Sequence, residues 1–188
     1  MLDPAELRSL LVSRGICIVH FSHHANMREG GVFPDDLLAA IEHSDQWNLS
    51  CCALWPGHQM ALPGDVGLIF EVDHPNQILS VCADDAGASQ TDDGAEVSGG
   101  LEPTKETIEA SLAVPLGGYN EWRVKGARVA GIYVENPDSI CVKQKLSVSV
   151  QGTSHEVIAA VQIRLDDIKA EFGKYQLFTL SDHGLAEI

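Results

Sequence analysis

The chain lacks several features that would each place it in a well-defined class of protein. It contains no P-loop, no Gly-x-Gly-x-x-Gly, no Gly-x-Ser-x-Gly and no Cys-x-x-Cys pair. The sequence therefore offers no motif for a P-loop nucleotidase, a dinucleotide-binding Rossmann unit, an α/β-hydrolase or a thiol redox centre. It also has no apolar run approaching the roughly 18 residues that a membrane-spanning helix requires, so we predict no membrane partner.

Basic residues are scarce and unevenly placed. Lys and Arg number 12 against 27 Asp and Glu, which gives a net charge of −15, and none occurs between Glu29 and Thr104. Such a surface repels a phosphate backbone, which argues against tracking along duplex DNA but allows a single nucleotide or a short strand. We expect phosphate groups to be held by backbone amides, by Arg28, or near a later basic cluster: Arg123, Lys125, Arg128, Lys143 and Lys145.

Cysteine usage and the first residues favour a cytoplasmic location. The five cysteines are odd in number, and the neighbours Cys51 and Cys52 cannot easily bridge each other, which is typical of reduced, buried thiols. The opening "MLDPAELRSLLVSRG" carries an acid early and no basic segment, unlike a signal peptide. We expect the protein to act in the cytoplasm, either of its own cell or of a cell that receives it.

The pattern of apolar residues predicts one α+β domain covering residues 1–188. Asp3, Pro4 and Glu6 form the N-cap signature of a helix that closes at Gly15, and further helices are expected over 34–41 and after Thr104. Regular crossover helices do not separate the strands, which favours a mainly antiparallel or mixed sheet. Strands are predicted at 16–21, 50–55, 66–72, 77–82, 119–124, 128–134, 139–150 and 175–180.

Two further segments are predicted from composition and spacing. The stretch at about 84–103 is acidic and rich in small residues, so we expect a mobile loop or an insertion that orders on binding. A C-terminal helix is predicted at about 154–172, because Thr153 and Glu156 match a capping box. Its apolar residues recur at helical spacing: Val157, Val161, Leu165, Ile168 and Phe172.

The closely spaced histidines could form a metal site. His20, His23 and His24 lie within five positions, and His58, Cys51 and Cys52 are further potential ligands. Strand alternation, however, places His20 and His23 on opposite faces and leaves only Ser22, a poor zinc ligand, beside His20. We predict no metal, and keep as an alternative a metal-dependent enzyme that uses His20, His23 or His58 with a cysteine.

One acid stands apart from the others. Glu121 is the only acid between Glu109 and Glu135, and Arg123 and Lys125 follow it on a predicted strand. Two interpretations are open, namely a surface ion pair with the neighbouring bases and a functional carboxylate.

The stretch "VHFSHHANMREGG" resembles the first strand and following helix of ADP-ribosyltransferases, and most closely the DarT-type toxins that modify bases in DNA. The residues that carry this likeness are His20, Ser22, Asn26, Met27 and the pair Gly30-Gly31. The later stretch "YNEWRVKGARVAGIYVENPDSICVKQKL" is similar to the glutamate strand of the same family, and "ILSVCADDAGAS" to the segment between them. The order and spacing agree over roughly residues 14–146.

This resemblance implies an ADP-ribosyltransferase-like fold of split, mixed or antiparallel sheets with flanking helices. It implies a mono-ADP-ribosyltransferase, a glycosyltransferase that consumes NAD as its substrate and acts as a toxin or defence effector. The implied catalytic residues are Glu121 and His20. His20 with Ser22 and Asn26 would bind NAD, Arg28 would hold the diphosphate, and nicotinamide would stack on an aromatic ring, for which Trp47 and Trp55 are the alternatives. His23 and His24 would then be bystanders.

The acceptor of ADP-ribose is not specified by the sequence. The charge distribution favours a protein or a nucleotide over duplex DNA, and the resemblance implies an antitoxin or immunity protein as a partner. The other alternative is a non-catalytic member of the same fold that binds a nucleotide or a partner. The acidic stretch from Asp84 to Gly100 favours it, because such a segment suits a basic partner.

Overall fold

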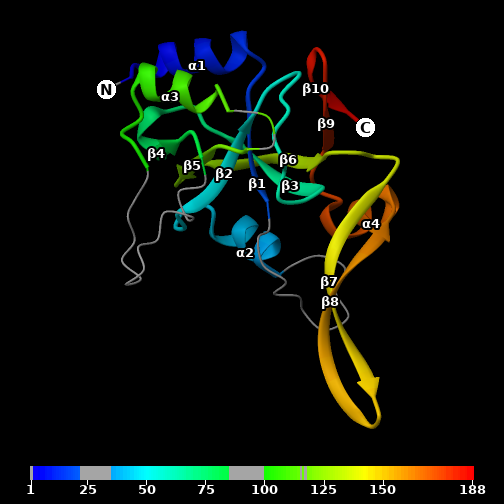
Figure 1. The fold of residues 1–188 in the computed structure, drawn as a ribbon. Coiled ribbons are helices and arrows are strands. Elements are labelled where there is room, and N and C mark those ends of the chain that lie inside the picture. The colour runs from blue at the N-terminus through cyan, green and yellow to red at the C-terminus, as the bar shows by residue number, and fades with distance from the viewer. Residues whose placement is uncertain (1, 22–34, 85–99, 115, 117) are drawn as a thin grey trace, which may run out of the picture.

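A computed structural model describes residues 2–21, 35–84, 100–114, 116 and 118–188 (Figure 1). This part of the chain is mixed α+β, as the sequence predicted. Its elements are α1 (Pro4–Ser13), β1 (Cys17–Phe21), α2 (Asp35–His43), β2 (Leu49–Leu54), β3 (Val66–Glu71), η1 (Pro75–Gln77), β4 (Ile78–Cys82), α3 (Lys105–Ser111), β5 (Glu121–Val124), β6 (Arg128–Val134), β7 (Ile140–Val150), β8 (Thr153–Ile163), α4 (Leu165–Phe172), β9 (Leu177–Ser181) and β10 (Gly184–Glu187).

A large mixed sheet forms the centre of the fold. Its eight strands run in the order β10-β9-β6-β3-β1-β2-β5-β4, and β7 and β8 form a separate two-stranded sheet. Neighbouring strands of the large sheet are antiparallel, except that β6 and β9 are parallel. The sheet is therefore mixed and mainly antiparallel, in agreement with the expectation from sequence.

Strand β2 is divided between two partners. Its second half, Cys52–Leu54, pairs with Cys17–Val19 of β1, whereas its first half, Leu49–Cys51, pairs with Trp122–Val124 of β5. Strand β1 continues to Phe21, where it pairs with β3 rather than with β2. The residue pairs that join β1 and β2 thus end at Val19, and beyond it β1 pairs only with β3.

The helices cover one face of the sheet. Each contributes a buried side chain to the first of two apolar clusters, and this cluster includes Leu7, Leu37, Ile108 and Ile168. Helices α1 and α3 lie side by side (Figure 1). The second cluster, on the other face, draws on strand and loop residues in the described part of the chain: Cys17, Val19, Phe21, Cys52, Leu54, Met60, Ile69 and Tyr133.

Local capping signals placed α1 and α3 correctly. Asp3 accepts a hydrogen bond from the backbone N–H of Ala5 at 2.7 Å, and its own N–H donates to Glu6 at 3.3 Å. Thr104 accepts from the N–H of Thr107 at 3.2 Å at the start of α3. These contacts satisfy amide groups that the first turn of a helix leaves unpaired.

The predicted helix at about 154–172 is wrong over its first half. Residues Thr153–Ile163 form β8, which pairs with β7 along its whole length, and only Leu165–Phe172 is helical. Gln151 and Gly152 both have positive φ angles, of 51° and 82°, as a two-residue hairpin turn requires. The β-branched residues that follow fit this strand, so the turn and the partner strand override the apparent capping box.

Two further expectations concern the segments beside the large sheet. Residues 85–99 of the predicted acidic loop lie outside the described residues, while Leu101 near its end pairs with Val81 through two backbone hydrogen bonds. The strand expected at 175–180 is β9, and the sequence pattern did not predict its hairpin partner β10.

Candidate active site

His20 lies where β1 and β2 separate. Its side chain is 8% exposed, and Nδ1 donates to the backbone carbonyl of Ser50 at 2.7 Å. A carbonyl oxygen only accepts, so the proton of the neutral ring is on Nδ1 and Nε2 is its acceptor nitrogen. The imidazole thus binds a β2 carbonyl beyond the last residue pair that joins the two strands.

Glu121 is the first residue of β5 and is only 4% exposed. One carboxylate oxygen, Oε1, accepts from the hydroxyl of Ser50 at 2.8 Å and lies 2.7 Å from Nε of Arg123. The ion pair that the simpler interpretation predicted is therefore present. Its acid is nevertheless buried, and the hydroxyl and the guanidinium both stabilise the negative charge of that carboxylate.

Ser50 contacts both His20 and Glu121. Its backbone carbonyl binds the imidazole and its hydroxyl binds the carboxylate. By strand alternation His20 shares a sheet face with Ile18, whereas Glu121 lies on the face opposite Trp122. Ile18 and Trp122 belong to the same apolar cluster, so the two side chains leave the sheet on opposite faces, and Ser50 is the residue that both contact. Ser50 was not among the residues predicted from sequence, and the available signal was a small polar residue inside the apolar strand "LSCCAL".

The residues on either side of Glu121 are anchored in the core. Asn120 is fully buried and makes two hydrogen bonds to the backbone of Ala53, as an acceptor at 2.7 Å and as a donor at 2.9 Å. The indole of Trp122, also fully buried, donates to Ser111 of α3 at 2.9 Å. These contacts fix the backbone of Glu121 between β2 and a helix.

The two candidate tryptophans lie at opposite ends of β2. Trp47 lies two residues before the strand, is 40% exposed and stacks on His43 with ring centroids 5.2 Å apart. Trp55 directly follows the strand and is half-buried against both apolar clusters. Five residues of extended chain, about 17 Å, separate Trp55 from Ser50, whereas Trp47 is three residues away.

The remaining candidate ligands do not gather into a metal site in the part of the chain that the structure describes. No group of three or more His, Cys, Asp and Glu side chains there is arranged to hold a metal ion. His58 packs edge-to-face on Trp55, and burial lowers the pKa of His58. Burial raises the pKa of the Cys51 thiol well above its usual value, which disfavours a nucleophilic thiolate at this position.

Several predicted site residues fall outside the described residues. These are Ser22, Asn26 and Arg28, together with His23 and His24. Their roles remain predictions from the resemblance.

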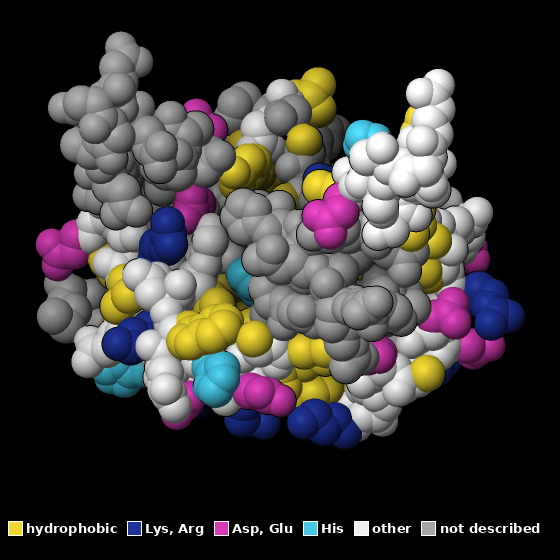
Figure 2. Space-filling view, turned by 90° about the horizontal axis from the view of Figure 1, so that it is seen from below, with side chains coloured by type: hydrophobic (Ala, Val, Ile, Leu, Met, Phe, Trp, Pro, Cys, Tyr) yellow, Lys and Arg dark blue, Asp and Glu magenta, His cyan; other side chains and the backbone are white. Residues whose placement is uncertain are grey.

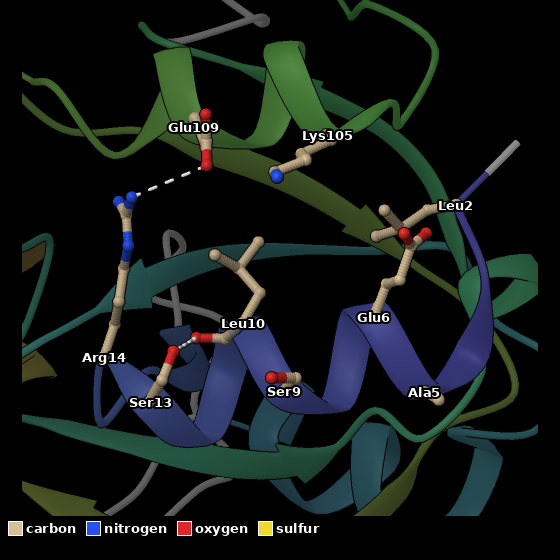
Figure 3. Close-up of a pocket in the computed structure, with 9 residues that line it drawn as sticks. All are labelled: Leu2, Ala5, Glu6, Ser9, Leu10, Ser13, Arg14, Lys105 and Glu109. Atoms are coloured by element: carbon tan, nitrogen blue, oxygen red, sulfur yellow. Dashed lines mark hydrogen bonds and ion pairs between the residues drawn. The ribbon is translucent and has the colours of Figure 1, made fainter.

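A pocket of about 520 Å³ lies between α1 and α3 (Figure 3). Leu2 and Leu10 line it together with charged side chains, among them Arg14 and Glu109, whose charged groups are 3.7 Å apart. None of its lining residues belongs to the group of His20, Ser50 and Glu121, so it is separate from the candidate site.

The face of the molecule seen in Figure 2 carries charges of both signs. Acidic and basic side chains lie near one another toward the rim, and apolar side chains lie nearer the middle. Among the side chains that this view colours, no broad basic patch is visible.

None of the helices in the described part is long and apolar enough to span a bilayer. No family model, curated protein or solved structure matches this chain.

Proposed function

We propose that this chain is a NAD-dependent mono-ADP-ribosyltransferase that acts as a toxin or defence effector. One observation carries the proposal: Ser50 holds an imidazole and a buried carboxylate at the point where β1 and β2 separate. The resemblance assigns catalytic roles to the same two residues, His20 and Glu121. The division of β2 between β1 and β5 further supports an ADP-ribosyltransferase-like split sheet.

The proposed reaction breaks the bond between ribose C1′ and nicotinamide. The bonding electrons leave with nicotinamide, and positive charge develops on the ribose. A fixed carboxylate stabilises this charge most strongly in the transition state, which is the role we assign to Glu121. A nucleophile of the acceptor then bonds to C1′ and releases its proton, and water in its place would give hydrolysis of NAD.

His20 would position the ribose. Its Nδ1 is held by Ser50, so Nε2 of the neutral ring is the nitrogen that accepts a hydrogen bond from a ribose hydroxyl. Trp47 is the better candidate for stacking on nicotinamide, because it is exposed and close in the chain to Ser50. Ser22 and Asn26 would complete the NAD site, and Arg28 would bind the diphosphate.

We infer the class of ADP-ribose acceptor from the charge of the chain, and the partner from the resemblance. A net charge of −15 favours a protein side chain or a nucleotide over duplex DNA as acceptor. We place the activity in the cytoplasm and expect an antitoxin or immunity protein as a partner.

The test is incubation of the purified protein with labelled NAD and candidate acceptors. Glu121→Gln keeps the size of the side chain and removes its charge. Glu71→Gln is the matched control, because Glu71 also pairs with an arginine, Arg128, from a sheet strand but is exposed. We expect label transfer or NAD loss with wild type and Glu71→Gln, and a loss of about a hundredfold or more with Glu121→Gln. Equal activity of the two variants, or none in wild type, would refute the proposal.

A further inference from the structure

The sheet face opposite the helices is polar at the β4 end of the sheet. Trp122 packs in the apolar cluster on the helix side, so strand alternation puts Glu121 and Arg123 on the opposite face. Ser50 of β2 and Ser80 of β4 are the register partners of Arg123, one on each side, and share its face. Among the described residues, the apolar cluster of this opposite face takes no side chain from β4 or β5. An acid–base pair flanked by two serines therefore occupies this end of the sheet.

Arg123 is held in place by a buried acid. Its Nε lies 2.7 Å from Oε1 of Glu121, and the side chain of Arg123 is 36% exposed against 4% for that of Glu121. In three ion pairs elsewhere in the described part of the chain, those of Arg14, Arg128 and Arg164, the acid is at least 36% exposed. The guanidinium of Arg123 thus differs from these three, because its partner is fixed within the fold.

The terminal nitrogens of Arg123 can bind an anion. A guanidinium carries five N–H donors, and the contact with Glu121 is made at Nε. No residue that the structure describes accepts a hydrogen bond from Nη1 or Nη2. Ser80 adds a half-buried hydroxyl on the β4 side. The pair of serines is short-chained, so a ligand can reach the guanidinium from the side.

A phosphate group on the 5′ carbon of ribose suits this position. Glu121 is the acid that we assign to the nicotinamide ribose, and in NAD this ribose carries a phosphate on its 5′ carbon. An acid that acts on the ribose and a cation that binds its phosphate have to be neighbours, as Glu121 and Arg123 are. The net charge of −15 and the adjacent carboxylate disfavour capture of a free anion, so binding needs the ribose as well.

We propose that Arg123 binds the 5′-phosphate of the ribose on which Glu121 acts, with the hydroxyl of Ser80 as a second donor. Two parallel N–H···O hydrogen bonds from a guanidinium match the geometry of a phosphate. The inference rests on the proposed function, because that function identifies the ribose. NAD has two phosphate groups, and Arg123 binds the one attached to the nicotinamide ribose, which leaves the second for the role predicted for Arg28.

The test compares two ligands that differ only in this phosphate, nicotinamide mononucleotide and nicotinamide riboside. Calorimetry gives the dissociation constant of each for the full chain, and chromatography checks that the ligands stay intact during the titration. The ratio of the two constants isolates the contribution of the phosphate, because a disturbance of Glu121 affects the ribose of both ligands alike. The variants are Arg123→Gln, Arg123→Lys, Ser80→Ala and the control Arg128→Gln, whose arginine pairs with the exposed Glu71.

We expect wild type to bind the mononucleotide at least about tenfold more tightly than the riboside. Arg123→Gln should remove most of this preference, Ser80→Ala part of it, and Arg128→Gln none. Arg123→Lys keeps a positive charge beside Glu121 but lacks the paired donors of a guanidinium, so it should also lower the preference. It serves as the test if Arg123→Gln does not fold, which circular dichroism establishes.

Equal binding of the two ligands by wild type, or binding of neither, would overturn the inference. An unchanged preference in the folded Arg123 variants, or an equal loss in Arg128→Gln, would do the same. The result is independent of the NAD assay, since no bond is broken. Binding that depends on Arg123 without cleavage of NAD would refute the proposed function alone. Cleavage that depends on Glu121 with an unchanged preference would refute this inference alone.

Discussion

Asn120 and Ala53 are joined by two hydrogen bonds that take the place of a pair of strand hydrogen bonds. The amide oxygen of Asn120 accepts from the backbone N–H of Ala53 at 2.7 Å, and its nitrogen donates to the carbonyl at 2.9 Å. The residue next in sequence is Glu121. Asn120 therefore fixes the position of the Glu121 backbone, the backbone of the proposed catalytic acid, relative to β2.

The contact between Asn120 and Ala53 predicts a large effect on stability. Asn120→Ala leaves a buried N–H and a buried carbonyl without their partner, which we expect to lower the free energy of unfolding by about 3 kcal/mol. Asn136→Ala is the control, because Asn136 is exposed and caps a turn by accepting from Asp138. It should cost about 0.5 kcal/mol or less. Urea denaturation measures both values, and similar losses would contradict the assigned role of Asn120.

Ser50 is predicted to act through Glu121. Ser50→Ala removes the hydroxyl bound to the carboxylate and keeps the backbone carbonyl bound to His20. We expect the rate of NAD cleavage to fall about 10- to 100-fold, with recovery in Ser50→Thr, which restores a hydroxyl. The measurement is kcat for nicotinamide release beside thermal unfolding. Loss of activity only in proportion to loss of folded protein would exclude this positioning role.

Trp47 is predicted to contribute to NAD binding, and Trp55 to the stability of the fold. Trp47→Ala removes an exposed ring near Ser50, so we expect NAD affinity to weaken roughly tenfold with little change in stability. Trp55→Ala removes a ring packed on both apolar clusters, so we expect a loss of about 2 kcal/mol in unfolding free energy. Calorimetry with NAD and urea denaturation separate the two effects. The reverse pattern would transfer the stacking role to Trp55.

Thiol reactivity tests the burial of the cysteines. Burial raises the pKa of Cys17 to about 12, and that of Cys51 well above its usual value, so little reactive thiolate is present in the folded protein. Cys141 is exposed. Iodoacetamide should therefore label Cys141 long before Cys17 and Cys51, which should react only after unfolding. Mass spectrometry identifies the labelled sites, and early modification of Cys17 would contradict its placement in β1.

Local signals in the sequence predicted much of the fold. The capping residues Asp3 and Glu6 act within one turn, so they fixed the start of α1 without reference to the rest of the chain. Thr153 and Glu156 carry the same signature, yet they lie in β8. The turn at Gln151-Gly152 and the pairing with β7 make this segment a strand. A prediction based on helical spacing considers neither of these features.

The candidate site was predictable only in part. His20 and Glu121 stand out in sequence as a strand histidine and an isolated acid, and each contacts Ser50 in the structure. Ser50 stands out only as a small polar residue in an apolar strand, because its contacts come from the register between β2 and β5 and from the end of the pairing between β1 and β2. Such pairings join residues far apart in the chain, and a single sequence does not encode them in any local pattern.

The most direct test of the central claim is a double-mutant cycle on nicotinamide release from NAD. Wild type, His20→Ala, Glu121→Ala and the double variant are compared by kcat/KM, with folding checked by circular dichroism. If the two residues act together on one ribose, each single change lowers the rate strongly and the double variant loses far less than the product of the two losses. Release at the same rate by wild type and Glu121→Ala, or losses that simply multiply, would contradict the account.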